Sequence, residues 1–243
     1  MTQYETIALD YQRISAAVPL REAEWHSLRL RLGELGGLSV LDLACGDGMG
    51  TRLLRRWGAA RVVGVDISPR MISLAQAQED AQPLGIEYRE ADAATLGGIG
   101  RFDRVAAAYL LHYAASREQL LGMMRTVYDN LAPGQHFVAS IANPLQPPRP
   151  VVDQRKYGFS YRLLDDTLDE GANLRGTLFL GDNTVEFDFH WWSWGVYEDA
   201  IRTAGFRSWT IEPFLIPPNH QRGDGFWDDY LAAPSAMHIT CRK

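Results

Sequence analysis

The chain has 243 residues, of which 46% are hydrophobic and 22% are charged, and this balance is ordinary for a globular enzyme. Its formal net charge of −6 gives no general electrostatic support for a nucleic-acid partner. The two cysteines, Cys45 and Cys241, lie far apart without metal-ligand spacing and predict reduced thiols. Residues 1–10 lack a signal-peptide pattern, and no apolar run has the length of a transmembrane helix. We therefore expect a cytoplasmic protein without a membrane partner.

The first part of the chain alternates helical and strand-like segments. Apolar residues recur at helical spacing over residues 4–35, with a break at Pro19, and predict two helices. We then expect strands at 39–43, 61–65, 86–89, 102–107 and 136–141, and helices at 50–57, 69–79 and 118–131. Ser68 is placed to cap the second of those three helices. In the first, the spacing of Arg52, Arg55 and Arg56 predicts a solvated face. This alternation favours a parallel sheet with helices on both faces.

The remainder of the chain departs from that alternation. Four prolines interrupt residues 143–150, and polar and apolar residues alternate before residue 190, so we expect a lid over residues 143–190. A helix at 194–204, stopped by Gly205, should be followed by strands at 209–212 and 238–241 with a long loop between them. The expected fold is one α/β, doubly wound domain, with N-terminal helices in 1–36, a ligand-binding core in 37–142 and a C-terminal part in 191–243. Its seven-stranded sheet should be mainly parallel, with an antiparallel C-terminal edge.

A glycine-rich turn joins the first predicted strand to the helix that follows it. Gly46, Gly48 and Gly50 would let a ligand approach the backbone, and the helix start offers free N–H groups. Thr51 stands where a dinucleotide-binding fingerprint would have its third glycine. A glycine turn alone is weak evidence, but it predicts a ligand at this end of the sheet.

Two carboxylates follow the next two predicted strands. Asp66 ends the second strand, where its carboxylate can accept both hydroxyls of a ribose. Asp92 follows the third strand and is placed to accept a hydrogen bond from an adenine amino group. Either residue can also be an ordinary strand-end or turn residue. Together with the glycine turn, they predict an adenosine site rather than a diphosphate site.

In this order and spacing, the motifs of residues 39–141 resemble those of class I, Rossmann-like methyltransferases that depend on S-adenosylmethionine (SAM). The segments that carry the resemblance are 42–48, 65–68, 91–93, 102–103 and 131–135. The resemblance implies that Ala44 and Gly46 contact the methionine part of SAM and that Asp66 binds the ribose. It implies that Ile67 and Met71 pack on the adenine, that Asp92 and Ala93 contact the adenine edge, and that Ala108 closes the site. It also implies S-adenosylhomocysteine (SAH) as product.

The N-terminal pattern Tyr4-x-x-Ile7-Ala8-x-x-Tyr11 is similar to the first helix of small-molecule members of this family, where a tyrosine caps the cofactor carboxylate. That role is transferred to Tyr11. A narrower resemblance, over residues 90–113, 190–206 and 225–228, is to bacterial natural-product methyltransferases of the toxoflavin (azapteridine) type. The aromatic residues described below predict a planar heteroaromatic acceptor methylated on a ring nitrogen or a hydroxyl oxygen, and this resemblance favours nitrogen, as in an azapteridine. The sequence differs from those enzymes mainly in residues 145–183, the part expected to select the substrate.

The side chains expected around the acceptor are a histidine and several aromatic residues. His112 follows the fourth strand, and it is either a general base or a packing residue. The candidates for substrate binding are aromatic residues that also suit a core, namely Tyr113, Trp191, Trp192, Phe226 and Trp227. We expect direct displacement at the SAM methyl group, with the protein orienting the reactants. No convincing metal cluster is present in the sequence, and no metal is expected.

Other functions remain as alternatives. A nicotinamide-dependent oxidoreductase also has an acid about twenty residues after its glycines, but Asp92 and the missing third glycine argue against it. A SAM-binding regulatory protein without catalysis is the non-enzymatic alternative. Methylation of nucleic acid or protein is disfavoured by the acidic charge, and by Ala-Tyr-Leu-Leu at residues 108–111 in place of an Asn-Pro-Pro-Tyr motif. We expect a small-molecule substrate and a monomer or homodimer.

Overall fold

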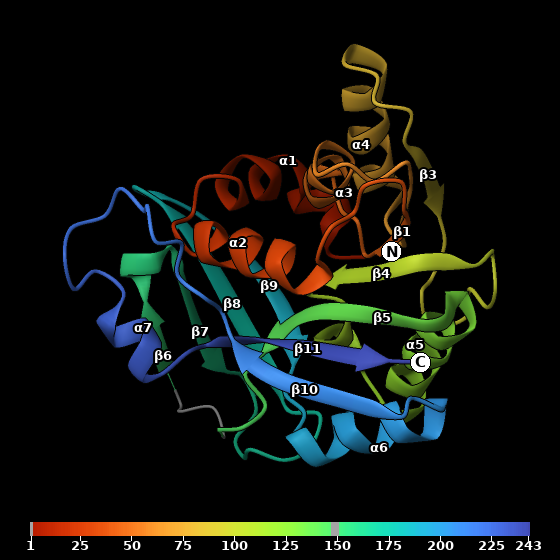
Figure 1. The fold of residues 1–243 in the computed structure, drawn as a ribbon. Helices are drawn as coiled ribbons and strands as arrows, with labels where there is room; N and C mark the ends of the chain where they lie inside the picture. Colours follow the sequence, from red (N-terminus) through yellow and green to blue (C-terminus); the bar gives the residue numbers. More distant parts are fainter. Residues whose placement is uncertain (1, 147–150) are drawn as a thin grey trace.

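The computed structural model describes residues 2–146 and 151–243, and a seven-stranded sheet forms its centre (Figure 1). The strand order is β10-β11-β5-β4-β1-β2-β3. The strands are β1 (Ser39–Leu43), β2 (Arg61–Asp66), β3 (Glu87–Glu90), β4 (Phe102–Ala108), β5 (Leu131–Ala142), β10 (Ser208–Pro213) and β11 (Ala236–Arg242). Strands β1 to β5 pair in parallel, whereas β11 is antiparallel to both β5 and β10. The predicted α/β, mainly parallel sheet with an antiparallel edge is confirmed.

Helices cover both faces of this sheet, because its strands are apolar on both sides. The helices are α2 (Leu20–Leu32), α3 (Met49–Arg56) and α4 (Pro69–Ala81) on one face, and α5 (Arg117–Asn130) and α6 (Trp194–Ala204) on the other. Val40 of β1 packs in a cluster with Leu28 and Leu54, whereas its neighbour Leu41 packs in the cluster that contains α5 and α6. Successive residues of a strand point to opposite faces, so burial of both faces requires the continuous apolar runs seen in the sequence.

The element boundaries follow local chemistry closely. The Ser68 hydroxyl accepts a hydrogen bond from the Met71 N–H at 3.2 Å and caps α4, as predicted. Gly205 ends α6 in the left-handed region, with φ of 109°. Two boundary predictions were wrong: β5 begins at Leu131 rather than at 136, and the segment expected to be a long loop contains helix α7 (Asp228–Ala232). Five residues give little hydrophobic periodicity, so such a helix leaves almost no pattern in the sequence.

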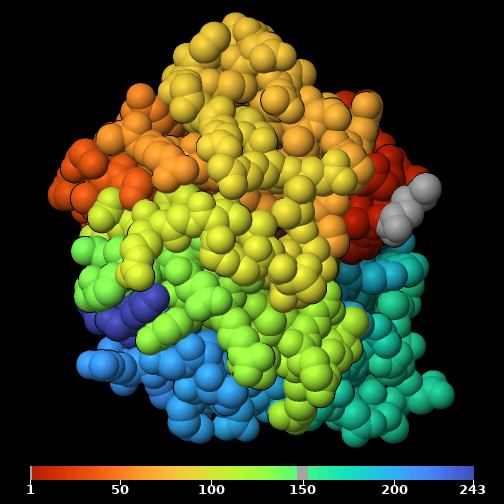
Figure 2. Space-filling view, turned by 90° about the vertical axis from the view of Figure 1, so that its right-hand side faces the viewer, coloured from red at the N-terminus to blue at the C-terminus, as the bar shows by residue number. Residues whose placement is uncertain are grey.

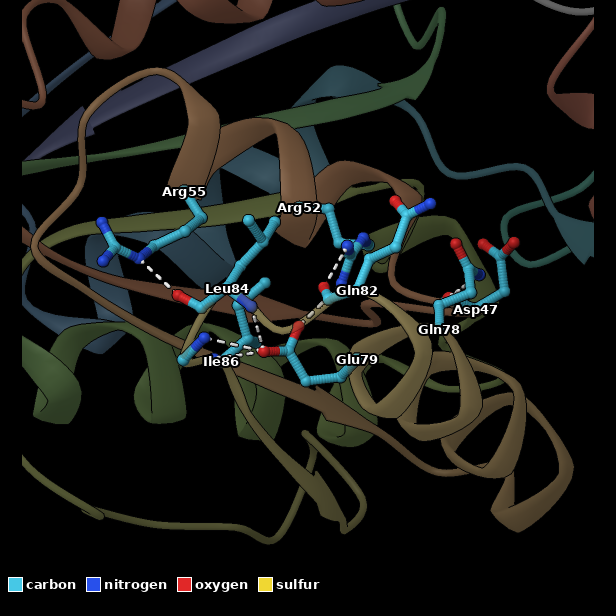
Figure 3. A network of polar contacts seen from close by, with 9 residues as sticks. Asp47, Arg52, Arg55, Gln78, Glu79, Gln82, Leu84 and Ile86 are labelled. Carbon is cyan, nitrogen blue, oxygen red and sulfur yellow. Dashed lines mark hydrogen bonds and ion pairs between the residues drawn. The ribbon is translucent and has the colours of Figure 1, made fainter.

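A polar network joins α3, α4 and the turn before β3 (Figure 3). Arg52, predicted to be solvated, is buried, and its guanidinium contacts Glu79 at 2.7 Å. Glu79 also accepts backbone hydrogen bonds from residues 84–86, which fix the turn. Gln78 donates to the Asp47 carbonyl oxygen at 2.9 Å. The network therefore anchors the glycine turn to α4, and the solvated-face prediction is corrected at Arg52.

A second, four-stranded antiparallel sheet lies beside the first. It contains β6 (Val151–Gln154), β7 (Phe159–Leu163), β8 (Asn173–Leu180) and β9 (Asn183–His190), in sequence order. All four strands fall within the lid predicted at 143–190, of which residues 147–150 lie outside the described residues. Helix α1 (Tyr4–Ser15) packs on this sheet through a cluster that includes Ile14 and Phe187. Figure 2 shows the N-terminal residues, in red, between the orange residues of the main sheet region and the teal residues of the lid. In the part of the chain that the structure describes, no helix is both long and apolar enough to cross a membrane.

Candidate active site

One cavity lies at the carboxyl ends of β1, β2 and β3, and its volume is about 1270 Å³ including the open mouth. Every residue predicted to bind the cofactor lines it, namely Tyr11, Ala44, Gly46, Asp66, Ile67, Met71, Asp92, Ala93 and Ala108. Gln3 and Tyr4 of the N-terminal segment and Asp188 of β9 line it as well. The Gln3 amide bonds both the backbone N–H and the carbonyl oxygen of Asp188, at 2.7 and 2.8 Å. The start of α1 is therefore fixed to the lid across the cavity.

The glycine turn after β1 has an unusual backbone. Gly46 and Gly48 have φ of 57° and 86°, and Ala44 has φ of 58°, a region that residues with a side chain rarely adopt. A Cβ atom at Gly48 would lie 2.5 Å from the Tyr88 hydroxyl, whereas one at Gly46 would meet nothing within 4 Å. Gly48 is required for packing. Gly46 instead leaves open space at the cavity, where a ligand can approach the main chain.

Asp66 ties the second strand to this turn. Its two carboxylate oxygens accept the backbone N–H groups of Gly46 at 2.8 Å and of Ser68 at 2.9 Å. Burial raises the pKa of Asp66, and these two hydrogen bonds oppose that rise. A carboxylate oxygen can accept more than one hydrogen bond, so both oxygens keep capacity for a ligand. Asp92 is held in the same way, because its Oδ1 accepts the Ala94 N–H at 2.8 Å.

A smaller hollow of about 530 Å³ continues beneath the glycine turn. Asp42 lines it and accepts a hydrogen bond from the Thr51 hydroxyl at 2.6 Å. Burial raises the pKa of Asp42 to about 7, although the Thr51 bond acts in the opposite direction. Asp47 also lines the hollow, and so does the buried Ser15 hydroxyl, which has no hydrogen-bond partner. This part of the site is therefore rich in carboxylates and has an unused polar atom.

A third cavity, of about 550 Å³, shares walls with the first. Tyr11, Tyr109 and Tyr113 line both cavities, and Tyr11 also lines the hollow beneath the glycine turn. The Tyr113 hydroxyl is hydrogen-bonded to that of Tyr4. The third cavity is walled by rings from the lid strands, contributed by Phe159, Phe187 and Phe189. It is consequently a largely apolar space adjoining the carboxylate-rich one, and we call it the aromatic cavity.

The aromatic cavity contains one buried ion pair. Arg21 contacts Glu24 at 2.6 Å, and the Glu24 side chain is completely buried. Arg21 also donates to the Tyr11 hydroxyl at 3.3 Å, and its guanidinium lies 5.3 Å from the centre of the Tyr109 ring. Burial raises the pKa of the Glu24 carboxyl, and the Arg21 charge counters this effect. Because the two charges are paired, this wall has little net charge.

His112 faces the same cavity from the segment after β4. Its Nδ1 accepts a hydrogen bond from the Ala142 N–H at 3.3 Å, and its buried Nε2 has no partner. Burial lowers the pKa of His112 to about 3. The imidazole is therefore neutral near pH 7, and since Nδ1 is an acceptor, the ring proton is on Nε2.

The structure brings only Tyr113 of the five predicted substrate-binding aromatic residues to the aromatic cavity. Trp192 packs in the core between the sheet and α5, and its Nε1 donates to the Ala114 carbonyl oxygen at 2.9 Å. Phe226 and Trp227 pack around Tyr157, and the Trp227 and Tyr157 rings are stacked with centres 5.2 Å apart. Trp191 packs beside the lid cluster without lining the cavity. These four residues pack against other side chains and do not line the aromatic cavity.

Sequence reasoning missed the residues that do line the aromatic cavity. Phe187 and Phe189 alternate with polar residues in β9, which was a usable signal for one inward face of the lid. Arg21 and Glu24 lie in α2, where an arginine and a glutamate three residues apart read as an ordinary surface pair. Their burial comes from long-range packing, because Glu24 lies 3.5 Å from the Ser140 hydroxyl of β5 and both residues line the cavity that is walled by the lid strands.

The fold is that of a Rossmann-like α/β protein, and its cavity lies at the strand ends, where such proteins bind ligands. Residues 40–134 match a methyltransferase domain family. The chain is 29% identical to a SAM-dependent methyltransferase from Mesorhizobium loti, whose structure superposes with a TM-score of 0.68 and coverage of 91% of this chain and 98% of that one. It is also 26% identical over 231 residues to N-demethylindolmycin N-methyltransferase of Streptomyces griseus, covering 89% of this chain and 92% of the relative. The whole chain is therefore similar to SAM-dependent methyltransferases, and residues 40–134 are the part that matches the domain family.

Other curated relatives match only in part. A demethylmenaquinone methyltransferase of Lactococcus lactis is 30% identical over 142 residues, which are 56% of this chain and 55% of that protein. The chain thus spans about half the length of such relatives. The residues that match the methyltransferase domain family, 40–134, end before the lid, so they contain the glycine turn, Asp66 and Asp92 but not the lid strands of the aromatic cavity.

The residues present fit SAM as cofactor. Carboxylates such as Asp66 and Asp92 accept hydrogen bonds from ribose hydroxyls and an adenine amino group. SAM has a positive sulfonium, and Asp42, Asp47 and Asp66 lie around the turn. Among the described residues that line these two cavities, Arg21 is the only cation. The unpartnered Ser15 hydroxyl supplies a further polar contact. The set is thus suited to a cationic nucleoside.

Proposed function

We propose that this protein transfers the methyl group of SAM to a planar, largely neutral heteroaromatic small molecule, on a ring nitrogen or a hydroxyl oxygen. The observation that carries the proposal is the aromatic cavity. It shares Tyr11, Tyr109 and Tyr113 with the cavity at the carboxyl ends of β1, β2 and β3, which we call the cofactor cavity. An acceptor in the aromatic cavity would adjoin the cofactor. Stacking between two aromatic rings contributes about 0.5–1.5 kcal/mol of binding free energy beyond that of the buried area. This lining therefore favours a flat acceptor.

We infer a role for each residue that was predicted to bind the cofactor. Ala44 and Gly46 would contact the methionine part of SAM, and Asp66 would accept the ribose hydroxyls. Ile67 and Met71 would pack on the adenine, Asp92 and Ala93 would contact its edge, and Ala108 would close the site. The support is that all of them line the one cavity. Tyr11, hydrogen-bonded to Arg21, would meet the cofactor carboxylate.

The acceptor would be held mainly by apolar contact. Tyr113 keeps its proposed substrate role, together with the lid residues Phe159, Phe187 and Phe189. The paired charges of Arg21 and Glu24 give no reason for a charged acceptor. Support for methylation of a ring-containing natural product comes from the narrower resemblance to toxoflavin-type enzymes and from the name of the Streptomyces griseus relative.

The chemistry would rest on orientation rather than on acid–base groups. SAM supplies a methyl group already activated by its sulfonium sulfur. The protein would align the acceptor and exclude water, as the closure of α1 on the lid through Gln3 and Asp188 supports. His112 is a poor general base here, because its pKa is about 3 and its Nδ1 is occupied.

The proposal is tested by a methylation screen with SAM labelled in its methyl group. Azapteridines, phenols, aliphatic amines and fatty acids are offered to the purified protein, and labelled product is measured. We expect turnover with the flat heteroaromatic or phenolic acceptors. Turnover confined to the aliphatic classes would contradict an aromatic acceptor site. Calorimetric titration with SAM and with NAD is the control, because binding of NAD alone would support an oxidoreductase.

A further inference from the structure

Two buried polar atoms in the aromatic cavity have no hydrogen-bond partner in the protein. They are His112 Nε2 and the Ser235 hydroxyl, and both residues line the cavity. A buried polar atom left unpaired costs about 1–3 kcal/mol, so natural proteins rarely keep two in one place without a reason. Their common location in a cavity beside the cofactor site indicates that a ligand completes their hydrogen bonds.

The proton positions at His112 follow from its surroundings. Nδ1 accepts the backbone N–H of Ala142, so the neutral ring presents its proton at Nε2. The rings of Tyr109, Tyr113 and Phe189, all of which line the cavity, surround the imidazole with centres 4.7 to 5.5 Å away. His112 is thus a neutral hydrogen-bond donor held among three aromatic rings.

Ser235 is held at the same edge of the cavity. It directly precedes Ala236, and Ala236 pairs with Ala142, the residue whose N–H is bonded to His112. The Ser235 carbonyl oxygen accepts the Asn143 N–H at 2.9 Å, which fixes the backbone there. The two unpaired groups are therefore linked through one pair of residues, because Ala142 at the end of β5 is bonded to His112 and is paired with Ala236, the neighbour of Ser235. A hydroxyl can donate or accept, whereas the imidazole here only donates.

We propose that His112 and Ser235 form a polar edge that binds a ring carbonyl of the acceptor, with the carbonyl oxygen accepting the His112 Nε2–H bond. Ser235 contacts the ring nitrogen or oxygen beside that carbonyl. The inference rests on the proposed function and narrows it: the acceptor is a flat ring that has a carbonyl, such as a cyclic amide or imide. His112 is then a positioning residue that selects and orients the acceptor without taking its proton.

The test uses two flat rings of the same size and opposite hydrogen-bonding character. Pteridine-2,4-dione presents carbonyl acceptors, and pteridine-2,4-diamine presents amino donors. Their affinities are measured by calorimetry with SAH present, so the result does not depend on turnover. We expect the native protein to bind the dione at least about 10-fold more tightly, the equivalent of one good hydrogen bond plus the cost of a mismatched one.

Two variants of His112 distinguish the loss of its hydrogen-bond donor from a general effect on the structure. His112→Phe keeps a ring of similar size and removes the donor, whereas His112→Gln keeps an N–H group near the position of Nε2. Both remove the imidazole nitrogen that accepts the Ala142 N–H, and SAH affinity checks that each variant keeps its fold. We expect His112→Phe to lose the preference for the dione and His112→Gln to retain most of it. SAH affinity should be unchanged in both, and Ser235→Ala should weaken the preference less.

The outcomes distinguish this inference from the proposed function. If the native protein binds both rings equally, or if His112→Phe keeps the preference, the carbonyl-binding edge is wrong although an aromatic acceptor site stands. If neither ring binds while the labelled-SAM screen shows aliphatic products only, the proposed function fails and the inference fails with it. A loss of turnover near four orders of magnitude in His112→Gln, with binding intact, would instead make His112 a general base.

Discussion

The cofactor cavity and the aromatic cavity are neighbours built in opposite ways. The first takes most of its lining from consecutive strand ends, and its key carboxylates, Asp66 and Asp92, are each anchored by backbone N–H groups. The second takes its lining from α1, α2, the segment after β4, the end of β5, the lid strands and the start of β11. Besides tyrosine hydroxyls, its polar groups include a paired arginine and glutamate and two unpaired atoms.

The difference indicates how one fold serves one cofactor and many acceptors. Backbone-anchored carboxylates are preorganised by the strands themselves, so the cofactor cavity survives changes elsewhere in the chain. The aromatic cavity depends on a separate antiparallel sheet, which can change its side chains without disturbing the strand ends. Substitutions on one side should therefore alter SAM binding, and substitutions on the other side should alter the acceptor.

The largest effect is expected at Asp66. Asp66→Ala should weaken SAM binding by roughly 1.5–3 kcal/mol, because it removes a charged acceptor of ribose hydroxyls and also frees the Gly46 N–H. Asp66→Asn is the matched control and should lose less, since an amide oxygen still accepts. Calorimetry measures both. Unchanged SAM affinity in a folded Asp66→Ala protein would remove the basis for the adenosine-site assignment.

A pair of helix glycines tests the packing behind the cofactor cavity. A Cβ atom at Gly122 of α5 would collide with the backbone carbonyl oxygen of Ala94, next to the turn that contains Asp92. Gly122→Ala should therefore lower the free energy of unfolding by about 1–3 kcal/mol and weaken SAM binding. At Gly195 of α6 the nearest atom would be 3.9 Å away, so Gly195→Ala should be neutral or stabilise by up to about 1 kcal/mol. Equal urea midpoints for the two variants would contradict this account.

The smallest effect is expected in the aromatic cavity, and it separates lining rings from packing rings. Phe159 lines that cavity, whereas Phe226, also partly buried, packs around Tyr157 outside it. Phe159→Leu should raise the KM for a heteroaromatic acceptor by the equivalent of about 0.5–1.5 kcal/mol of stacking and leave SAM affinity unchanged. Phe226→Leu should leave both unchanged. If steady-state kinetics show a larger rise in KM for Phe226→Leu than for Phe159→Leu, the C-terminal aromatic residues bind the substrate, as the sequence predicted.

The sequence alone was sufficient for the sheet and for the cofactor cavity. Buried strands leave apolar runs, caps such as Ser68 mark helix starts, and a glycine turn with Asp66 and Asp92 at strand ends predicts convergence at one edge. These features are local, because each depends on residues a few positions apart and on the regular geometry of a parallel sheet. That is why Gly46, Asp66 and Asp92 lie at one edge of the sheet, whereas the other predicted cofactor-binding residues, which line the same cavity, were predicted from the family resemblance.

Only the tertiary structure decided which side chains line the aromatic cavity. Aromatic residues bury large areas wherever the core requires them, so composition could not separate Trp192 and Trp227, which fill the interior, from Phe187 and Phe189, which line the cavity. Arg21 and Glu24 are one helical turn apart and look solvated in the sequence, yet the packing of residues more than a hundred positions away buries them. Such burial depends on contacts between residues far apart in the sequence, and these contacts cannot be predicted from the spacing of residues within one segment.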